Sequence, residues 1–194
     1  MAVLAHLAEA PMHVYRMQQL IKERAKDTVV NVAQRNSLYQ TIARLVRDEL
    51  VRVQQTSREE RRPERVVYEL TETGRTTLDR WLDDMLAVPA REFPAFPAAL
   101  AFLAILPPRR ARERLEARQA ALEQQLTASR NTLQSVLASG LPRLFILEDE
   151  YKNAMIEGEL AWLAGVIRDL ARGKLTWSRA WLREVARRMS KPSD

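Results

Sequence analysis

The chain has 194 residues, of which 46% are hydrophobic and 29% are charged, and only five are glycine. This composition is typical of a folded, mostly helical protein and argues against an all-β fold or a disordered chain. The net charge of +6 is carried mainly by arginine, but residues 1–88 hold 14 basic against 13 acidic side chains. Overall charge therefore gives little support for nucleic-acid binding, and only local clusters of basic residues can support it.

Several classes of function are excluded by what the sequence lacks. The absence of cysteine excludes disulfides, thiol catalysis and thiolate metal sites. His6 and His13 lack the spacing of a metal site, and no phosphate-binding loop or catalytic motif occurs. We therefore expect no enzyme activity, no catalytic residues, no metal and no cofactor.

The longest apolar run, Ala98–Leu106, is too short to cross a bilayer. We expect a cytoplasmic protein without a membrane partner.

Residues 2–50 are predicted to form three helices. Pro11 ends a short apolar segment, and apolar residues then recur at helical spacing over residues 13–26. A connector rich in β-branched residues at 28–32 leads to the third helix, predicted over residues 36–50. At 100° per residue, its apolar side holds Leu38, Ile42, Leu45 and Val46, and its polar side holds Ser37, Gln40, Thr41, Arg44 and Arg47.

The polar side of the third helix carries hydroxyl, amide and guanidinium groups. These groups read base edges when a helix enters the major groove of DNA. An ordinary amphipathic surface helix is the alternative interpretation of the same residues.

A two-stranded hairpin is predicted after Leu50, because apolar residues now recur at every second position over 51–54 and 65–70. Its charged tip, residues 56–64, would project as a wing. The tip and its base carry four arginines, which can contact DNA phosphates: Arg58, Arg61, Arg62 and Arg65. A solvated charged loop is the alternative, because three glutamates nearly balance these arginines.

Thr71 is predicted to cap a fourth helix, whose apolar stripe is Leu78, Trp81, Leu82 and Met85. Prolines at 89, 94 and 97 then mark a linker. We place a winged helix-turn-helix DNA-binding domain at residues 1–88 and a helical dimerisation and effector domain at 89–194. The predicted fold class is mainly α: an N-terminal winged helix-turn-helix (three helices plus a two-stranded wing) followed by an all-α C-terminal domain.

The C-terminal half is predicted to contain a short buried helix ending at Pro107–Pro108, a long helix over 108–139, and a second long helix ending at Arg172. The apolar residues of that second long helix are Leu144, Leu147, Tyr151, Met155, Trp162, Val166 and Leu170. A last helix is predicted over 177–189, after a cap at Thr176. One thin hairpin cannot bury both long stripes, so we expect a homodimer.

Five aromatic residues of this half have two interpretations. They line an effector pocket, or they belong to an aromatic core or dimer core, which is the preferred interpretation. The five are Phe96, Phe102, Trp162, Trp177 and Trp181.

Four short motifs occur in order along the chain. They are PMHVY at residues 11–15, NSLY at 36–39 followed by Arg44–Leu45, Arg62–Pro63 with YELTETGR at 68–75, and ELAW at 159–162. In this order and spacing, the motifs resemble the PadR family of winged-helix transcriptional regulators. The corresponding family patterns are P-M-H-G-Y, G-S-L-Y…R-L, the wing with Y-x-L-T-x-x-G-R, and a C-terminal helix of longer members. The close resemblance covers residues 2–86.

This resemblance implies a dimeric transcription factor, usually a repressor of nearby genes, that a small-molecule effector or a stress signal releases from double-stranded DNA. By position, Gln40, Thr41 and Arg44 would contact base edges, and Arg35 and Ser37 would contact phosphate. Tyr39 would either pack or contact phosphate. The predicted DNA-binding set is Arg35, Asn36, Ser37, Tyr39, Gln40, Thr41, Arg44, Arg58, Arg61, Arg62 and Arg65.

The sequence departs from the family pattern at three motif positions. Val14 and Asn36 replace glycines, and Gln40 replaces a proline and so adds an exposed amide to the polar face. The chain also begins almost inside its first helix, which leaves a start codon further upstream as an alternative.

A helical adaptor, whose winged helix binds a protein partner rather than DNA, is the second functional hypothesis.

Overall fold

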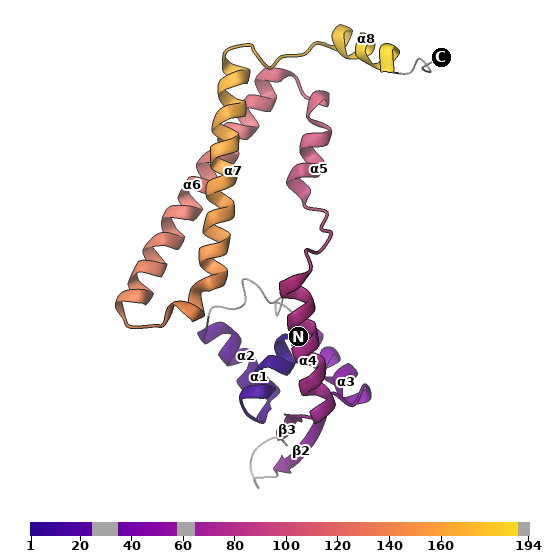
Figure 1. The fold of residues 1–194 in the computed structure, drawn as a ribbon, viewed down its shortest axis with the longest axis vertical. Coiled ribbons are helices and arrows are strands. Elements are labelled where there is room, and N and C mark those ends of the chain that lie inside the picture. Colours follow the sequence, from indigo (N-terminus) through magenta and orange to yellow (C-terminus); the bar gives the residue numbers. More distant parts are fainter. Residues whose placement is uncertain (25–34, 58–64, 190–194) are drawn as a thin grey trace. The chain divides into compact units, whose positions relative to one another are not determined.

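The structure is a computed structural model that describes residues 1–24, 35–57 and 65–189 (Figure 1). The chain divides into two compact units, Met1–Glu92 and Phe93–Asp194. Over the described ranges, no helix is long and apolar enough to span a bilayer.

In its described residues, the first unit combines four helices with a small antiparallel sheet. Its helices are α1 (Ala2–Glu9), α2 (Val14–Glu23), α3 (Arg35–Arg47) and α4 (Glu72–Ala87). Its strands are β1 (Met12–His13), β2 (Val51–Ser57) and β3 (Arg65–Leu70), in the spatial order β1-β3-β2. The predicted fold class is confirmed for this unit, with one strand more than the sequence indicated.

The core of the first unit forms where the apolar sides of the helices meet the sheet. Leu4 of α1, Met17 of α2, Ile42 of α3 and Val51 of β2 are each at most 2% exposed. Leu78 of α4 joins the same cluster. Each such side chain contributes about 1.5–3 kcal/mol by leaving water. This burial fixes which side of α3 faces inward.

The additional strand, β1, pairs with β3, with Met12 opposite Tyr68 and His13 opposite Val67. Two residues are too few to show an alternating pattern in the sequence. The hairpin also contains a register shift between Val53 and Gln55. Val53, predicted on the same side as the buried Val51, is 48% exposed beside this irregularity.

The junction between α3, β2 and α4 is held by hydrogen bonds between the Thr71 hydroxyl and the backbone. α3 ends at Arg47, not at Leu50 as predicted, because Glu49 adopts a left-handed φ of 57°. Thr71 caps α4 as predicted: its Oγ1 accepts a hydrogen bond from the Gly74 amide at 2.9 Å and donates to the Glu49 carbonyl at 2.8 Å. The end of α3 and the start of α4 therefore share one hydrogen-bonded turn.

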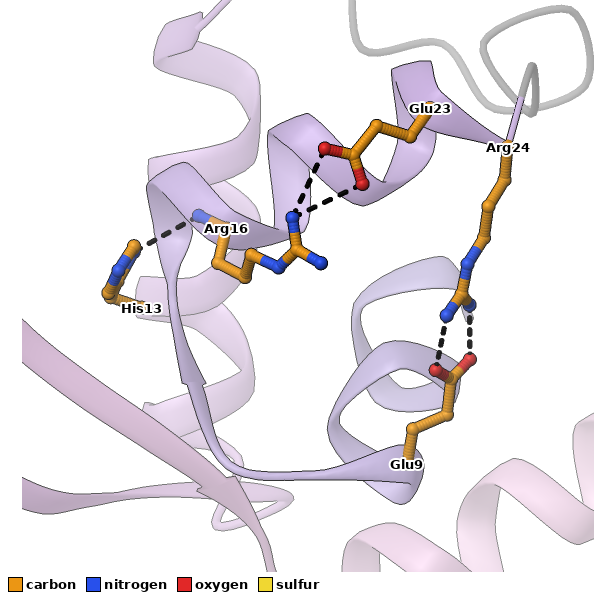
Figure 2. A network of polar contacts seen from close by, with 5 residues as sticks. All are labelled: Glu9, His13, Arg16, Glu23 and Arg24. Carbon is orange, nitrogen blue, oxygen red and sulfur yellow. Dashed lines mark hydrogen bonds and ion pairs between the residues drawn. The ribbon is translucent and has the colours of Figure 1, made fainter.

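A polar network joins α1 to α2 (Figure 2). The guanidinium of Arg24 donates two hydrogen bonds to the Glu9 carboxylate, at 2.5 and 2.7 Å, and Arg16 binds Glu23 at 3.2 Å. His13 Nδ1 accepts a hydrogen bond from the Arg16 amide and so caps α2. His13 therefore has a structural role at the entry of this helix.

His6 lies at the buried edge of this network and is 8% exposed. Burial lowers the pKa of His6, and Arg24 lowers it further, whereas the Glu9 carboxylate at 4.0 Å raises it. The unfolded chain therefore binds more protons than the folded one below a pH of about 6.5, and protonation favours unfolding.

We predict that the free energy of unfolding decreases from about pH 7 to about pH 5, and that a His6→Leu variant shows a smaller decrease. Chemical unfolding of both proteins at the two pH values measures this difference. Equal decreases in the two proteins would mean that His6 does not cause the pH dependence.

The second unit is helical, and this part of the predicted fold class is also confirmed. Its elements are α5 (Ala95–Ala101), the 3-10 turn η2 (Leu103–Ile105), α6 (Pro108–Ala138), the 3-10 turn η3 (Arg143–Ile146), α7 (Leu147–Ala171) and α8 (Arg179–Met189). α6 and α7 form a long hairpin (Figure 1). Ion pairs cross it from Arg118 to Glu159 and from Arg130 to Glu157.

Two predictions for the second unit need correction. α5 has no buried residue, although a buried helix was predicted there. α8 begins at Arg179, and its first turn is capped by Ser178, whose Oγ accepts from the Trp181 amide, rather than by Thr176.

The apolar residues of α7 do not all face one way. Its buried residues are Asn153, Leu163 and Leu170, whereas Tyr151 and Met155, which recur at helical spacing in the sequence, are 66% and 57% exposed. The helix has two apolar sides, and periodicity alone does not say which of them meets α6.

Candidate nucleic-acid interface

The outward side of α3 is the first element of the candidate interface. Leu38, Ile42 and Leu45 are at most 6% exposed, which anchors the inner side of the helix. Gln40 and Arg44 are exposed on the opposite side, and Thr41 is half-buried. Because Gln40 and Arg44 are four residues apart, their side chains are neighbours on the helix surface. An amide beside a guanidinium can form hydrogen bonds to two adjacent base pairs.

Tyr39 and Arg47 flank this pair. Tyr39 is 55% exposed, so its ring is not part of the core. The Arg47 side chain is 75% exposed and lies 3.4 Å from Asp48. Arg47 was absent from the predicted DNA-binding set, although its spacing from Gln40 and Arg44 places it on the same side. The side chains of Arg35, Asn36 and Ser37, in the first turn of α3, lie outside what the structure describes.

The β2–β3 hairpin is the second element. It follows α3 directly and contacts it through β2. Ser57 and Arg65 are the last paired residues before the tip. Arg58, Arg61 and Arg62 lie outside the described residues, as does the side chain of Arg65. Near the base of the hairpin, Arg52 binds Glu69 at 2.5 Å, so this arginine is already neutralised within the sheet.

The sequence profile of the transcriptional regulator PadR-like family matches residues 3–80. This segment runs from α1 through the helix-turn-helix and the hairpin into α4. Residues 3–80 are a PadR-like domain. The resemblance seen in the motifs is thereby confirmed, and the family is one of transcriptional regulators rather than of enzymes.

Solved structures similar to this chain extend the likeness in fold beyond that domain. Bacillus subtilis PadR in complex with operator DNA has a TM-score of 0.69 and 17% identity, covering 87% of this chain and 95% of that one. The same protein with p-coumaric acid has a TM-score of 0.70 and 16% identity, covering 88% of this chain and 96% of that one. The Vibrio cholerae virulence activator AphA has a TM-score of 0.65 and 18% identity, covering 87% of this chain and 95% of that one. At these identities the likeness establishes the fold. No curated protein sequence matches the chain.

Two of the three departures from the PadR motifs can be placed in the structure. Val14, where the family has glycine, is 5% exposed in the core and begins α2. Gln40, where the family has proline, lies in the first half of α3 and is exposed. At this position Gln40 provides a backbone N–H and a side-chain amide, and proline has neither of these groups.

The five aromatic residues of the second unit are only partly brought together. Phe96 packs edge-on against Trp162, with ring centroids 6.1 Å apart, and the Arg118 guanidinium lies 3.7 Å from the Phe96 ring centroid. Trp177 joins the same apolar cluster, and its Nε1 donates to the Leu106 carbonyl at 2.9 Å. The remaining two, Phe102 and Trp181, are 68% and 54% exposed. This arrangement holds α5 against the α6–α7 hairpin, which fits the aromatic-packing interpretation better than an open pocket.

Proposed function

We propose that the chain is a dimeric, sequence-specific transcriptional regulator that binds double-stranded DNA in the cytoplasm. The observation that carries the proposal is the outward polar side of α3, with Gln40 and Arg44 adjacent, next to an arginine-bearing hairpin within a PadR-like domain. A similar fold is recorded in a complex of Bacillus subtilis PadR with operator DNA. The first unit would bind DNA and the second would hold the dimer.

Within this proposal the two elements have different tasks. α3 enters the major groove, where Gln40, Thr41 and Arg44 contact base edges and the first turn contacts phosphate through Arg35, Asn36 and Ser37. The exposed hydroxyl of Tyr39 is a further phosphate contact. The hairpin follows the DNA backbone through the arginines at 58, 61, 62 and 65.

Repression of nearby genes, released by a small ligand, is the regulatory mode we propose. Bacillus subtilis PadR is recorded with p-coumaric acid, which supports a small-molecule effector for a chain of this fold. AphA is described as an activator. The direction of regulation must therefore come from transcription measured with and without the protein.

The experiment that tests the function is capture of fragmented genomic DNA by the purified protein, followed by sequencing of the bound fragments. A dimer with two equivalent α3 helices should enrich an inverted repeat whose half-sites are centred about 10 bp apart, or a multiple of that distance. Recovery of fragments without a shared motif would contradict sequence-specific binding.

Changing both Arg61 and Arg62 to alanine should weaken binding to every DNA sequence rather than to one. Each lost phosphate contact reduces the slope of log affinity against log salt by about 0.9, so we expect a reduction of roughly 1.8 per bound protomer. Titrations of a specific and a random duplex at several salt concentrations measure it. An unchanged slope would remove these two arginines from the interface.

A further inference from the structure

One row of polar side chains runs along the outward side of α3. At 100° per residue, Gln40, Arg44 and Arg47 lie within about 60° of one another. The buried Leu38 and Ile42 lie on the opposite side of the helix, so the row faces away from the core. All three side chains of the row are exposed. The row is therefore the surface that α3 would present to the major groove.

Two of these three side chains are available for new hydrogen bonds. In the part of the chain that the structure describes, no hydrogen bond or ion pair engages the side chain of Gln40 or Arg44. In contrast, Nε of Arg47, the last residue of α3, lies 3.4 Å from the Asp48 carboxylate. In helix-turn-helix proteins, residues nearer the N-terminus of the recognition helix contact the base edges. Gln40 and Arg44 are therefore the two residues of the row that can recognise bases.

These two side chains present different hydrogen-bonding patterns. The amide of Gln40 has an NH₂ donor beside a carbonyl acceptor, whereas the guanidinium of Arg44 has donors only. In the major groove, adenine presents a donor (N6) beside an acceptor (N7), and guanine presents two acceptors (O6 and N7). Gln40 is therefore complementary to adenine, and Arg44 is complementary to guanine.

The composition of α3 also favours recognition of purines. From Arg35 to Arg47 the helix contains no aspartate and no glutamate. A carboxylate is the side-chain group that accepts a hydrogen bond from the amino group of cytosine. Because α3 has no carboxylate, it would recognise a G·C pair through the guanine and not through the cytosine.

The spacing of Gln40 and Arg44 fits two neighbouring base pairs. Residues that are four apart on a helix have Cβ atoms about 5–6 Å from each other. Successive base pairs are about 3.4 Å apart along the DNA axis. The separation of the two side chains is thus smaller than two base-pair steps, so their flexible ends can reach adjacent pairs.

We propose that each half-site of the operator contains an A·T pair directly beside a G·C pair. Gln40 binds adenine at N6 and N7, and Arg44 binds guanine at O6 and N7. The inference rests on the proposed sequence-specific regulator and names the bases that α3 recognises. Proline, which the PadR motif has at position 40, offers no amide to a base. The adenine contact therefore depends on this chain's own departure from the motif.

A Gln40→Glu variant tests the assignment through a change of base preference. Glutamate has the size and shape of glutamine, but its carboxylate only accepts hydrogen bonds, so it pairs with the cytosine amino group instead of adenine. Position 40 is exposed, so the fold should be retained. The natural full-length chain and the variant each select duplexes from a randomised library, and the bound duplexes are sequenced. We expect cytosine to replace adenine at one position of each half-site, with the adjacent G·C pair unchanged.

Titration of two duplexes measures the size of this change. The duplexes carry either A·T or C·G at the assigned position of one half-site and are otherwise identical. The natural chain should bind the A·T duplex roughly fivefold to hundredfold more tightly, and Gln40→Glu should prefer the C·G duplex. Because the two affinities are compared within one protein, the general effect of the added negative charge cancels. Gln40→Ala, which adds no charge, should bind both duplexes equally.

Gln54→Glu is the matched control. Gln54 is an exposed glutamine of β2 in the same unit, so the chemical change and the change in net charge are identical. This variant should select the same bases as the natural chain. The same shift in Gln54→Glu as in Gln40→Glu overturns the inference.

The outcome for the natural chain separates this inference from the proposed function. If the natural chain selects a motif in which the A·T pair beside the G·C pair is missing, the inference is wrong and the proposed function stands. The same holds if Gln40→Ala retains the natural preference at every position. If the natural chain selects no shared motif, the proposed function is contradicted, and this inference with it.

Discussion

Replacing Arg44 by alanine should weaken binding to the specific operator by about 1–3 kcal/mol for each half-site, because one guanidinium contact to a base edge is lost. Arg44 is exposed, and its neighbours Leu45 and Ile42 hold the helix in place, so folding should not change. Binding to random DNA should weaken much less. The measurement is a fluorescence titration of operator and random duplexes at one fixed salt concentration.

Arg80→Ala is the matched control for this experiment. Arg80 is an exposed arginine of α4 in the same unit, so the change in net charge is identical. If Arg44→Ala and Arg80→Ala reduce operator affinity equally, the effect is general electrostatics, and the assignment of the outward side of α3 is wrong.

Replacing Gly74 by alanine should lower the free energy of unfolding of the first unit by about 3 kcal/mol or more. A Cβ atom at this position would lie 2.0 Å from the Leu50 carbonyl oxygen and 2.8 Å from Leu70 Cδ1. The Leu50 oxygen is backbone and also accepts from the Thr71 amide at 3.2 Å, so it cannot move freely. Alanine favours a helix over glycine by only about 1 kcal/mol, which is less than the cost of this clash.

Thermal and chemical unfolding of the full chain measure the effect of Gly74→Ala. Arg75→Ala places the same side chain at the next position, which is exposed, and it should leave stability almost unchanged. Equal stability of the two variants would show that the α3–β2–α4 junction is looser than its contacts indicate. If Gly74→Ala is destabilised, DNA binding should fall with it, because this junction orients α3 relative to the hairpin.

The winged helix-turn-helix could be predicted because its signals are local. Each signal depends only on residues that are close together in the sequence. These signals are the helical spacing of Leu38 and Ile42, the alternation in the hairpin and the cap at Thr71. β1 could not be predicted in the same way, because Met12 becomes a strand only by pairing with Tyr68, far along the chain.

The sequence could mark Gly74 as a special position, but it could not give the reason. Its position in the motif YELTETGR marked it, but the reason for a glycine there is the carbonyl of Leu50, which only the fold brings close.

α7 shows a limit of helical periodicity. Its apolar residues were recognised from their spacing, but the spacing did not assign them to a side: Leu170 is buried, whereas Tyr151 and Met155 are exposed. A polar residue, Asn153, holds a buried position on the side that does face α6. That placement depends on the partner helix and on where the hairpin turns, neither of which a single helical pattern contains.

The central claim is that the outward side of α3 reads a DNA sequence, and the ratio of two affinities tests it most directly. The purified natural chain is titrated, at one physiological salt concentration, against the inverted repeat recovered from genomic DNA and against a duplex of the same length and composition in scrambled order. We predict tighter binding to the repeat by about a thousandfold or more. Equal affinities for the two duplexes would contradict the account and favour an adaptor whose winged helix binds protein.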